Sequence, residues 1–325
     1  MKVTVLGTGA FGLALASIFY KNNFKIKMWS PYDDEIKKLK KDNKNKSRLS
    51  EYKIPKDFKF TSNLEEAIKD SSLIVIATPT GAIDKVSQEL KKYVKNTQHI
   101  CIASKGIEQD TCLFPVDVLK KHLKTDNISV VSGGSFAVDI VNEYPIGLSV
   151  ATKKEEAKEL LSKAFNNNYV KIRFNNDLIG TELCGAIKNV VAIAAGIIEG
   201  LNLPESSKAM FITESVHDIK TLISLIGGNK KTIMSFAGFG DLLLTCTSPK
   251  SRNFSFGIML GKKLSKKKID EYINNTTIEG LYTLKSIYTL LKNKNIELPL
   301  INLIYDIVFN EKDPSSLITF LNSKE

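Results

Sequence analysis

Short, continuous apolar runs alternate with segments of helical periodicity throughout the first half of the chain. Runs that stay apolar at every position are typical of strands covered on both faces, whereas half-exposed strands alternate apolar and polar residues. Strands of this kind, taking turns with helices, predict a parallel, doubly wound α/β sheet. The expected strands cover residues 3–6, 24–29, 58–61, 73–78, 100–104, 128–132, 146–151 and 169–174.

The pattern changes after Asn175 and Asn176, where strand signals nearly disappear. Apolar residues then recur at helical spacing, which predicts an all-helical second domain. We therefore expect two domains, residues 1–175 with the sheet and residues 176–325 with helices only. The expected helices cover residues 178–201, 205–226, 251–263, 279–293 and 298–309.

Three glycines follow the first expected strand with the spacing G-x-G-x-x-G. Gly7 permits a tight turn, Gly9 removes the side chain that would block a pyrophosphate, and Gly12 lets the next helix pack closely on the strand. The N-terminus of that helix then faces the phosphates. Because the motif stands between a strand and a helix, it predicts a Rossmann-type dinucleotide-binding domain in residues 1–175.

The residue after the second strand selects between the two nicotinamide cofactors in this fold. An acid there binds the ribose 2′-hydroxyl of NAD, and a basic group receives the 2′-phosphate of NADP. Here the position is Ser30, followed by Pro31 and Tyr32, with Asp33 and Asp34 close behind. We therefore expect NAD(H) or NADP(H), with the preference open.

A single lysine, Lys188, lies in the middle of an apolar, small-residue helix at residues 180–200. Helical spacing puts it on one face with Cys184, Gly185 and Ala192. An ammonium in so crowded a place loses hydration, which favours the neutral amine and makes proton transfer near neutral pH accessible unless a carboxylate is present. A lysine can also lay its stem along a helix and keep its head in water. This segment alone leaves both interpretations open.

Further polar residues stand at expected strand ends or beside glycine and proline turns. Arginine suits a phosphate because its fork makes paired hydrogen bonds, and a carboxylate suits a buried lysine because it holds the ammonium in place. Taken singly, each residue is equally explained by a helix cap, a turn or a surface charge. They are Lys105, Gly133 and Ser135 in the first half, and Asp241, Ser251, Arg252 and Asn253 in the second.

Composition and charge narrow the class of protein. A chain of 325 residues with 43% hydrophobic and 25% charged residues is typical of a globular protein with two domains. The net charge of +11 comes from lysines spread over helix surfaces, which argues against a nucleic-acid interface. The four cysteines and three histidines form no metal-binding pattern, so we expect no metal. The chain shows neither a charge-free apolar run of membrane length nor a signal sequence, so we expect no membrane span and a cytoplasmic location.

Seven motifs, taken together, resemble the bacterial-type NAD(P)-dependent glycerol-3-phosphate dehydrogenases over essentially the whole chain. They are GTGAFG at Gly7, SKG at Ser104, SGGSFA at Ser132, ELCGAIKNVVAIAAG at Glu182, GFGDLLLTC at Gly238, KSRN at Lys250 and IEG at Ile278. The resemblance implies an oxidoreductase that moves a hydride between NAD(P)H and C2 of dihydroxyacetone phosphate, giving sn-glycerol 3-phosphate for glycerophospholipid synthesis. It also implies a phosphorylated small-molecule substrate, and the family often forms homodimers.

The resemblance assigns roles to individual residues as well. Lys188 is the implied proton donor and acceptor, with Lys105 and Asp241 as further catalytic residues. The implied substrate contacts are Lys105, Gly133, Ser135, Lys188, Asp241, Thr245, Ser251, Arg252 and Asn253, with Arg252 and Asn253 holding the phosphate. The implied cofactor contacts are Gly7, Gly9, Ala10, Phe11, Gly12, Ser30, Lys105, Ala137, Arg252, Thr277 and Glu279.

The chain departs from the family pattern at three places. The usual SGPSFA has Gly134 in place of proline, which makes this loop more flexible. The usual aromatic-leucine-proline reads Arg48-Leu49-Ser50. The arginine expected after Trp29 is missing, which weakens the case for a strong preference for NADP(H).

Two other functions fit part of the pattern. A related two-domain dehydrogenase of the 3-hydroxyacid type would also use a helix lysine, but it would recognise a carboxylate or acyl chain. A cofactor-binding sensor would need no catalysis. The joint presence of Lys105, Lys188, Asp241 and Arg252 argues against the sensor, which has no use for them.

Overall fold

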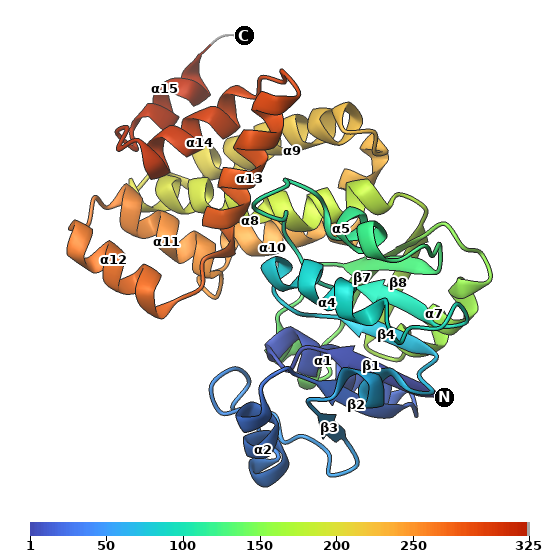
Figure 1. The fold of residues 1–325 in the computed structure, drawn as a ribbon. Coiled ribbons are helices and arrows are strands. Elements are labelled where there is room, and N and C mark those ends of the chain that lie inside the picture. Colours follow the sequence, from blue (N-terminus) through green and yellow to red (C-terminus); the bar gives the residue numbers. More distant parts are fainter. Residues whose placement is uncertain (324–325) are drawn as a thin grey trace. The chain divides into compact units, whose positions relative to one another are not determined.

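The computed structural model describes residues 1–323, which divide into two compact units (Figure 1). The first unit comprises Met1–Lys105 and Pro115–Leu178. The second comprises Gly106–Phe114 and the chain from Ile179 onward. The predicted boundary between a cofactor-binding domain, residues 1–175, and a substrate-binding domain, residues 176–325, stays a prediction.

One eight-stranded sheet forms the centre of the described first unit, in the order β3-β2-β1-β4-β5-β6-β7-β8. The order confirms the predicted doubly wound sheet, because the strands run outward in both directions from β1 and β4. The glycine turn follows β1, beside this switch point. The strands are β1 (Lys2–Leu6), β2 (Lys25–Trp29), β3 (Lys59–Thr61), β4 (Leu73–Ile76), β5 (His99–Ile102), β6 (Ile128–Ser132), β7 (Ile146–Thr152) and β8 (Val170–Asn175).

The sheet is mostly parallel, as predicted, and the exception is at β7. Strands β1 to β6 are parallel, whereas β7 runs antiparallel to β6, with Ser132 opposite Ser149, and β8 runs parallel to β7. The link from β6 to β7 carries only helix α6 (Ala137–Val141), whose five residues rise about 7.5 Å. Five-residue β6 is about 16 Å long. The chain therefore turns back at the edge where β6 ends.

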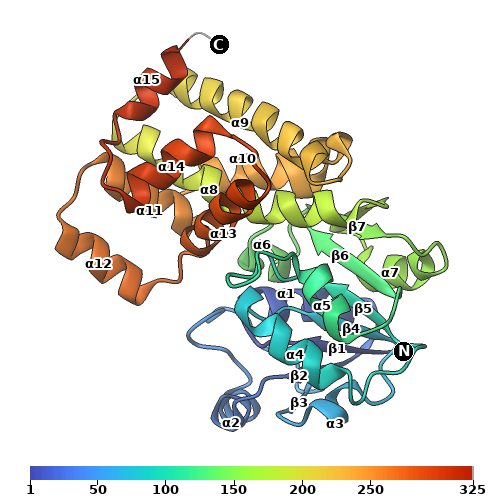
Figure 2. The same ribbon diagram turned by 45° about the horizontal axis from the view of Figure 1, so that its top comes forward.

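Two groups of helices accompany the sheet. Helix α1 packs with α6 and α7, and α4 lies side by side with α5 (Figures 1 and 2). Val3 and Val5 of β1 belong to the same core as Leu15 and Phe19 of α1, so this helix is fixed directly above the strand that leads into it. The helices are α1 (Ala10–Lys21), α2 (Asp33–Asp42), α3 (Leu64–Ile68), α4 (Ile83–Leu90), α5 (Pro115–His122), α6 and α7 (Ala157–Phe165).

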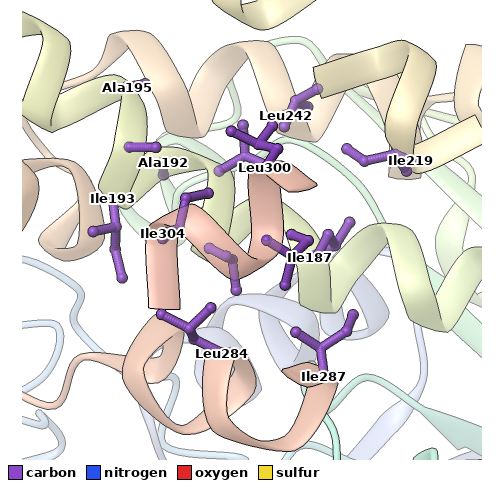
Figure 3. Close-up of a cluster of buried hydrophobic side chains, with 14 of the residues drawn as sticks. Ile187, Ala192, Ile193, Ala195, Ile219, Leu242, Leu284, Ile287, Leu300 and Ile304 are labelled. Atoms are coloured by element: carbon purple, nitrogen blue, oxygen red, sulfur yellow. The ribbon is translucent and has the colours of Figure 1, made fainter. Parts of the chain in front are cut away.

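The described second unit is helical and is built around α8. Side chains of α8 such as Ile187 and Ile193 lie in one cluster with Ile219 of α9, Leu284 of α13 and Ile304 of α14 (Figure 3). The α-helices are α8 (Leu178–Gly200), α9 (Glu205–Leu225), α10 (Asp241–Thr247), α11 (Arg252–Gly261), α12 (Lys266–Asn275), α13 (Glu279–Asn293), α14 (Pro299–Phe309) and α15 (Ser316–Asn322). Within residues 1–323, α8 alone is long and apolar enough to cross a membrane, and 89% of that stretch is buried, as in the core helix of a globular protein.

Four glycines let α8 and α11 touch backbone to backbone. Gly196 and Gly200 of α8 face Gly257 and Gly261 of α11, at the four-residue spacing seen in close helix crossings. A Cβ atom at Gly257 would lie 1.9 Å from the carbonyl oxygen of Ile193. Only glycine fits at this crossing, and it fixes α11 against the helix that carries Lys188.

A short strap from the first half of the chain completes the core of the second unit. Residues Gly106–Phe114 leave the sheet domain directly after Lys105, with Gly106 at φ +138°. The side chains of Ile107, Cys112 and Phe114 are buried in the same cluster as α8. The helical unit is therefore not one continuous stretch of sequence.

Candidate active site

The glycine turn has the geometry of a phosphate-binding loop. Gly7 adopts φ +118°, and a Cβ atom there would lie 2.6 Å from the Ala77 carbonyl oxygen. A Cβ atom at Gly12 would lie 2.4 Å from the Gly7 carbonyl oxygen, so both glycines are required by close backbone contacts. At Gly9, the N-cap residue of α1, a Cβ atom would meet nothing within 4 Å. The open space before the helix N-terminus fits the pyrophosphate of a dinucleotide.

Several predicted site residues of the first unit come together at the ends of β5 and β6. The Lys105 ammonium donates a hydrogen bond to the Gly133 carbonyl oxygen at 3.2 Å and lies 5.4 Å from the ring centre of Phe11. The Ser135 hydroxyl is buried without a hydrogen-bond partner among the described residues. Ala137 begins α6, and Ala10 begins α1.

Ser30 lies directly after β2 and is only 3% exposed. Its hydroxyl donates to the Glu35 carboxylate at 2.5 Å. Glu35 lies in the first turn of α2, five residues further along the chain. Glu35 gives no signal in the sequence, because its carboxylate reaches the end of β2 only once α2 has formed.

The second unit brings Lys188, Asp241 and Thr245 into one cluster. The Lys188 ammonium donates to Asp241 Oδ1 at 2.5 Å and to Thr245 Oγ1 at 3.2 Å. The Lys188 side chain is 12% exposed and that of Asp241 is 2% exposed, so the pair is shielded from water. The Thr245 hydroxyl in turn donates to the Asp241 carbonyl oxygen at 2.6 Å. The Lys188 ammonium is therefore shielded rather than held in water, and a carboxylate accompanies it.

The backbone before Asp241 explains how this carboxylate reaches the lysine. A π-helical turn, Phe236–Gly240, leads directly into α10, whose first residue is Asp241. A Cβ atom at Gly238 would lie 2.1 Å from the Ile233 carbonyl oxygen. A carboxylate in the first turn of a helix is also favoured by the helix dipole. Burial raises the pKa of the neighbouring Cys246 thiol, which marks the apolar character of this interior.

A second network surrounds the predicted phosphate-binding residues. The Asn253 side chain donates to Asn189 Oδ1 at 2.9 Å and accepts the Gly280 backbone N–H at 2.9 Å. Asn189 also donates to the Glu279 carboxylate at 3.3 Å, and Arg252 lies 4.0 Å from the same carboxylate. Asn189 therefore connects the lysine helix to a predicted substrate residue and a predicted cofactor residue. Sequence reasoning missed Asn189, although its place next to Lys188 was a usable signal.

The N-terminus of α11 presents the remaining predicted residues. Ser251 is the N-cap, and its side chain accepts the Phe254 N–H at 3.2 Å. The Arg252 side chain is 48% exposed, and the Tyr272 hydroxyl donates to the Arg252 carbonyl oxygen at 3.2 Å. Thr277 is exposed in the link between α12 and α13. An exposed guanidinium at a capped helix N-terminus can bind a phosphate dianion.

Comparison with known proteins places both halves of the chain in one family. Residues 2–158 match the N-terminal region, and residues 177–319 the C-terminal region, of NAD-dependent glycerol-3-phosphate dehydrogenase. The NAD(P)+ glycerol-3-phosphate dehydrogenase of Fusobacterium nucleatum is 36% identical over 99% of this chain and 96% of its own. That of Staphylococcus haemolyticus is 33% identical over 95% of this chain and 94% of its own.

A solved structure gives the same result for the fold. The crystal structure of glycerol-3-phosphate dehydrogenase from Coxiella burnetii superposes with a TM-score of 0.92 at 29% identity, covering 99% of both chains. The sequence motifs, the sheet order and these matches agree over the full length. The chain therefore belongs to the NAD-dependent glycerol-3-phosphate dehydrogenase family and is an oxidoreductase of that family.

Proposed function

We propose that this enzyme interconverts dihydroxyacetone phosphate and sn-glycerol 3-phosphate with NAD(H) or NADP(H), and that it supplies glycerol phosphate for glycerophospholipid synthesis. The observation that carries the proposal is the shielded pair of Lys188 and Asp241 in a chain of this family. In this proposal residues 1–175 bind the cofactor, and residues 176–325 supply the lysine that transfers the proton.

Lys188 is the proton donor in ketone reduction in this proposal. When bound, the cofactor supplies the hydride that reaches C2 of the ketone. The carbonyl oxygen gains negative charge as that carbon is reduced, and the Lys188 ammonium gives it a proton, so the product is an alcohol. In the reverse direction the neutral amine takes the same proton. Asp241 and Thr245 hold the nitrogen in one place, which removes the cost of orienting it during the reaction.

The phosphate of the substrate is assigned to the N-terminus of α11. Arg252 supplies a fork of N–H donors, and Ser251 and Asn253 flank it at the helix start. Binding the phosphate away from the reacting carbon fixes the substrate and raises its effective concentration at the lysine. Lys105, with Gly133 and Ser135 beside it, is assigned to the substrate from the first unit.

The first test is Lys188→Ala, with oxidation of NADH and of NADPH followed by absorbance in the presence of dihydroxyacetone phosphate. We expect turnover to fall by about a thousandfold or more, because general acid catalysis is lost. Trp29 is the only tryptophan of the chain, so quenching of its fluorescence reports cofactor binding, which should persist. Lys220→Ala, which removes an exposed lysine of α9, is the matched control.

Near-normal turnover by Lys188→Ala would contradict the assignment. Activity of the native enzyme toward an unphosphorylated hydroxyacid, with none toward dihydroxyacetone phosphate, would replace it with the hydroxyacid reaction.

The phosphate assignment is checked by Arg252→Ala. This variant should raise KM for dihydroxyacetone phosphate by about 10- to 100-fold, since a hydrogen bond to a charged group contributes about 1.5–3 kcal/mol.

A further inference from the structure

The end of β2 is tied directly to the glycine turn. The Gly7 N–H donates to the Trp29 carbonyl oxygen at 2.8 Å, and Ser30 is the next residue. In a doubly wound fold this strand end receives the adenosine ribose of the cofactor, and the group that stands there selects between a 2′-hydroxyl and a 2′-phosphate. Ser30 and its partners therefore stand at the position that governs cofactor choice in this fold.

The carboxylate at this strand end comes from the following helix. Ser30 carries no charge, but its hydroxyl is bound to Glu35 at 2.5 Å, and the Tyr32 N–H points to the same hydroxyl at 3.4 Å. A carboxylate offers two oxygens and about four acceptor positions. Glu35 can therefore hold Ser30 and accept the ribose 2′-hydroxyl together.

From this geometry we infer that Glu35, held by Ser30, is a specificity-determining residue that makes the enzyme prefer NADH to NADPH. The inference rests on the proposed function. Glu35 would take the part of the acid that usually stands directly after β2, at the position of Ser30, although it lies five residues later in the chain. A 2′-phosphate dianion placed beside this carboxylate would be repelled, and the loss of the ribose hydroxyl would remove a hydrogen-bond donor to Glu35.

The surrounding charges support the same preference. Asp33 and Asp34 lie in the same helical turn as Glu35. The Asp33 carboxylate is bound by the Ser62 hydroxyl, which keeps it at this end of the helix, and Asp34 is paired with Lys37 at 3.5 Å. Three carboxylates in the first turn of α2 oppose the attraction that the helix N-terminus alone would exert on a phosphate.

Cations of the loop after α2 provide the opposing influence. The Asn45 side chain donates to the Thr8 carbonyl oxygen at 2.9 Å, which brings this loop to the glycine turn. Lys46 is paired with Asp42 at 2.9 Å, while Arg48 is exposed. Arg48 is thus the guanidinium that would receive a 2′-phosphate if the preference were reversed, and it defines the second arm of the test.

The test is a direct measurement of binding. Quenching of Trp29 fluorescence is recorded during titration with NADH and with NADPH. Calorimetric titration with 5′-AMP and with adenosine 2′,5′-bisphosphate repeats the comparison on the adenosine part alone. We expect NADH to bind at least about tenfold more tightly than NADPH, a difference of about 1.4 kcal/mol. The 2′-phosphate should weaken binding of the adenosine fragment in the same direction.

Glu35→Gln keeps the size of the side chain and removes its charge. It should weaken NADH binding, strengthen NADPH binding and bring the ratio of the two Kd values towards one. Glu156→Gln, which removes an exposed glutamate next to α7, should leave the ratio unchanged. A role of Glu35 in folding alone would shift both Kd values together and would contradict the inference.

Equal affinities, or tighter binding of NADPH, would overturn the preference, and a selective loss of NADPH binding in Arg48→Ala would then identify the residue responsible. The proposed function fails in a different way. If neither cofactor is oxidised with dihydroxyacetone phosphate although both bind, the reaction is wrong whatever the ratio of Kd values.

Discussion

The glycine turn of the first unit and the lysine cluster of the second present different kinds of group to their proposed ligands. In the first unit the glycine turn exposes backbone and open space, and Gly9 contributes by having no side chain. In the second unit the site consists of ionisable and amide side chains from helices distant in sequence. Lys188 and Asp241 are 53 residues apart, and Asn189 and Glu279 are 90 apart. A backbone site therefore depends on one local turn, whereas the side-chain site depends on how the helices pack.

Removing the charge of Asp241 tests the side-chain site most severely. Asp241→Asn leaves the Lys188 ammonium shielded from water without its carboxylate, so we expect kcat to fall by at least about a hundredfold. The Kd for the cofactor, measured by quenching of Trp29 fluorescence, should be unchanged. Asp270→Asn on α12 is the control. Retained kcat in a folded Asp241→Asn enzyme would refute the dependence on this pair.

Acid should act on the first unit through His99 of β5. Burial lowers the pKa of His99 to about 4, and its ring is bonded to Ser129 at 3.0 Å. The unfolded chain, with a histidine pKa near 6.5, takes up the proton first as the pH falls. The contribution of neutral His99 to the free energy of unfolding is therefore fully present above about pH 6.5. Up to about 3 kcal/mol of it is lost between pH 6.5 and 4. Denaturant titrations across this range should show the loss, and an identical slope in His99→Asn would exclude His99 as its source.

Glycines of the second unit serve packing, which Gly257→Ala tests. The added Cβ atom would lie 1.9 Å from the Ile193 carbonyl oxygen, so α11 must move away from α8. We expect the free energy of unfolding to fall by about 2–3 kcal/mol in denaturant titrations. Gly81→Ala, whose Cβ meets nothing within 4 Å, should change it by less than about 0.5 kcal/mol. Equal stability of the two variants would contradict the backbone contact.

Gly9→Ala makes the opposite prediction for the first unit. Its Cβ also meets nothing within 4 Å, and φ −67° suits alanine, so thermal stability should be unchanged. The methyl group would occupy the space assigned to the pyrophosphate, so we expect NADH to bind about tenfold more weakly, or about 1.4 kcal/mol. Undiminished affinity for NADH would show that the phosphates do not pass this residue.

Sequence patterns predicted the first unit well because its signals are local. The expected strands correspond to β1 through β8, and the glycine motif gave the turn after β1. The reversal at β7 could not be predicted, because apolar runs say that a strand is buried and not which way it runs. Helix α2 gave only a weak apolar signal, since Ile36 and Leu39 are its only buried residues and the others are charged.

The side-chain site was less accessible to prediction. Lys188 was conspicuous as a charge in a small-residue helix, but no local pattern named its partner. Asp241 by itself was equally explained as a helix cap, and only the resemblance to a family connected the two residues. Asn189 acquires its partners only after the helices have packed, and Glu35 reaches Ser30 only once α2 has formed, so neither contact is visible in the sequence.

The strap Gly106–Phe114 limits how the two halves of this enzyme can be exchanged with those of relatives. The C-terminal family region begins at residue 177, yet the helical core also contains Ile107, Cys112 and Phe114. A recombinant that takes only residues 177 onward from a relative would combine a foreign core with the native strap, and mismatched volumes would leave gaps or clashes. The helical unit is therefore encoded by two separate stretches of sequence, which have to be exchanged together.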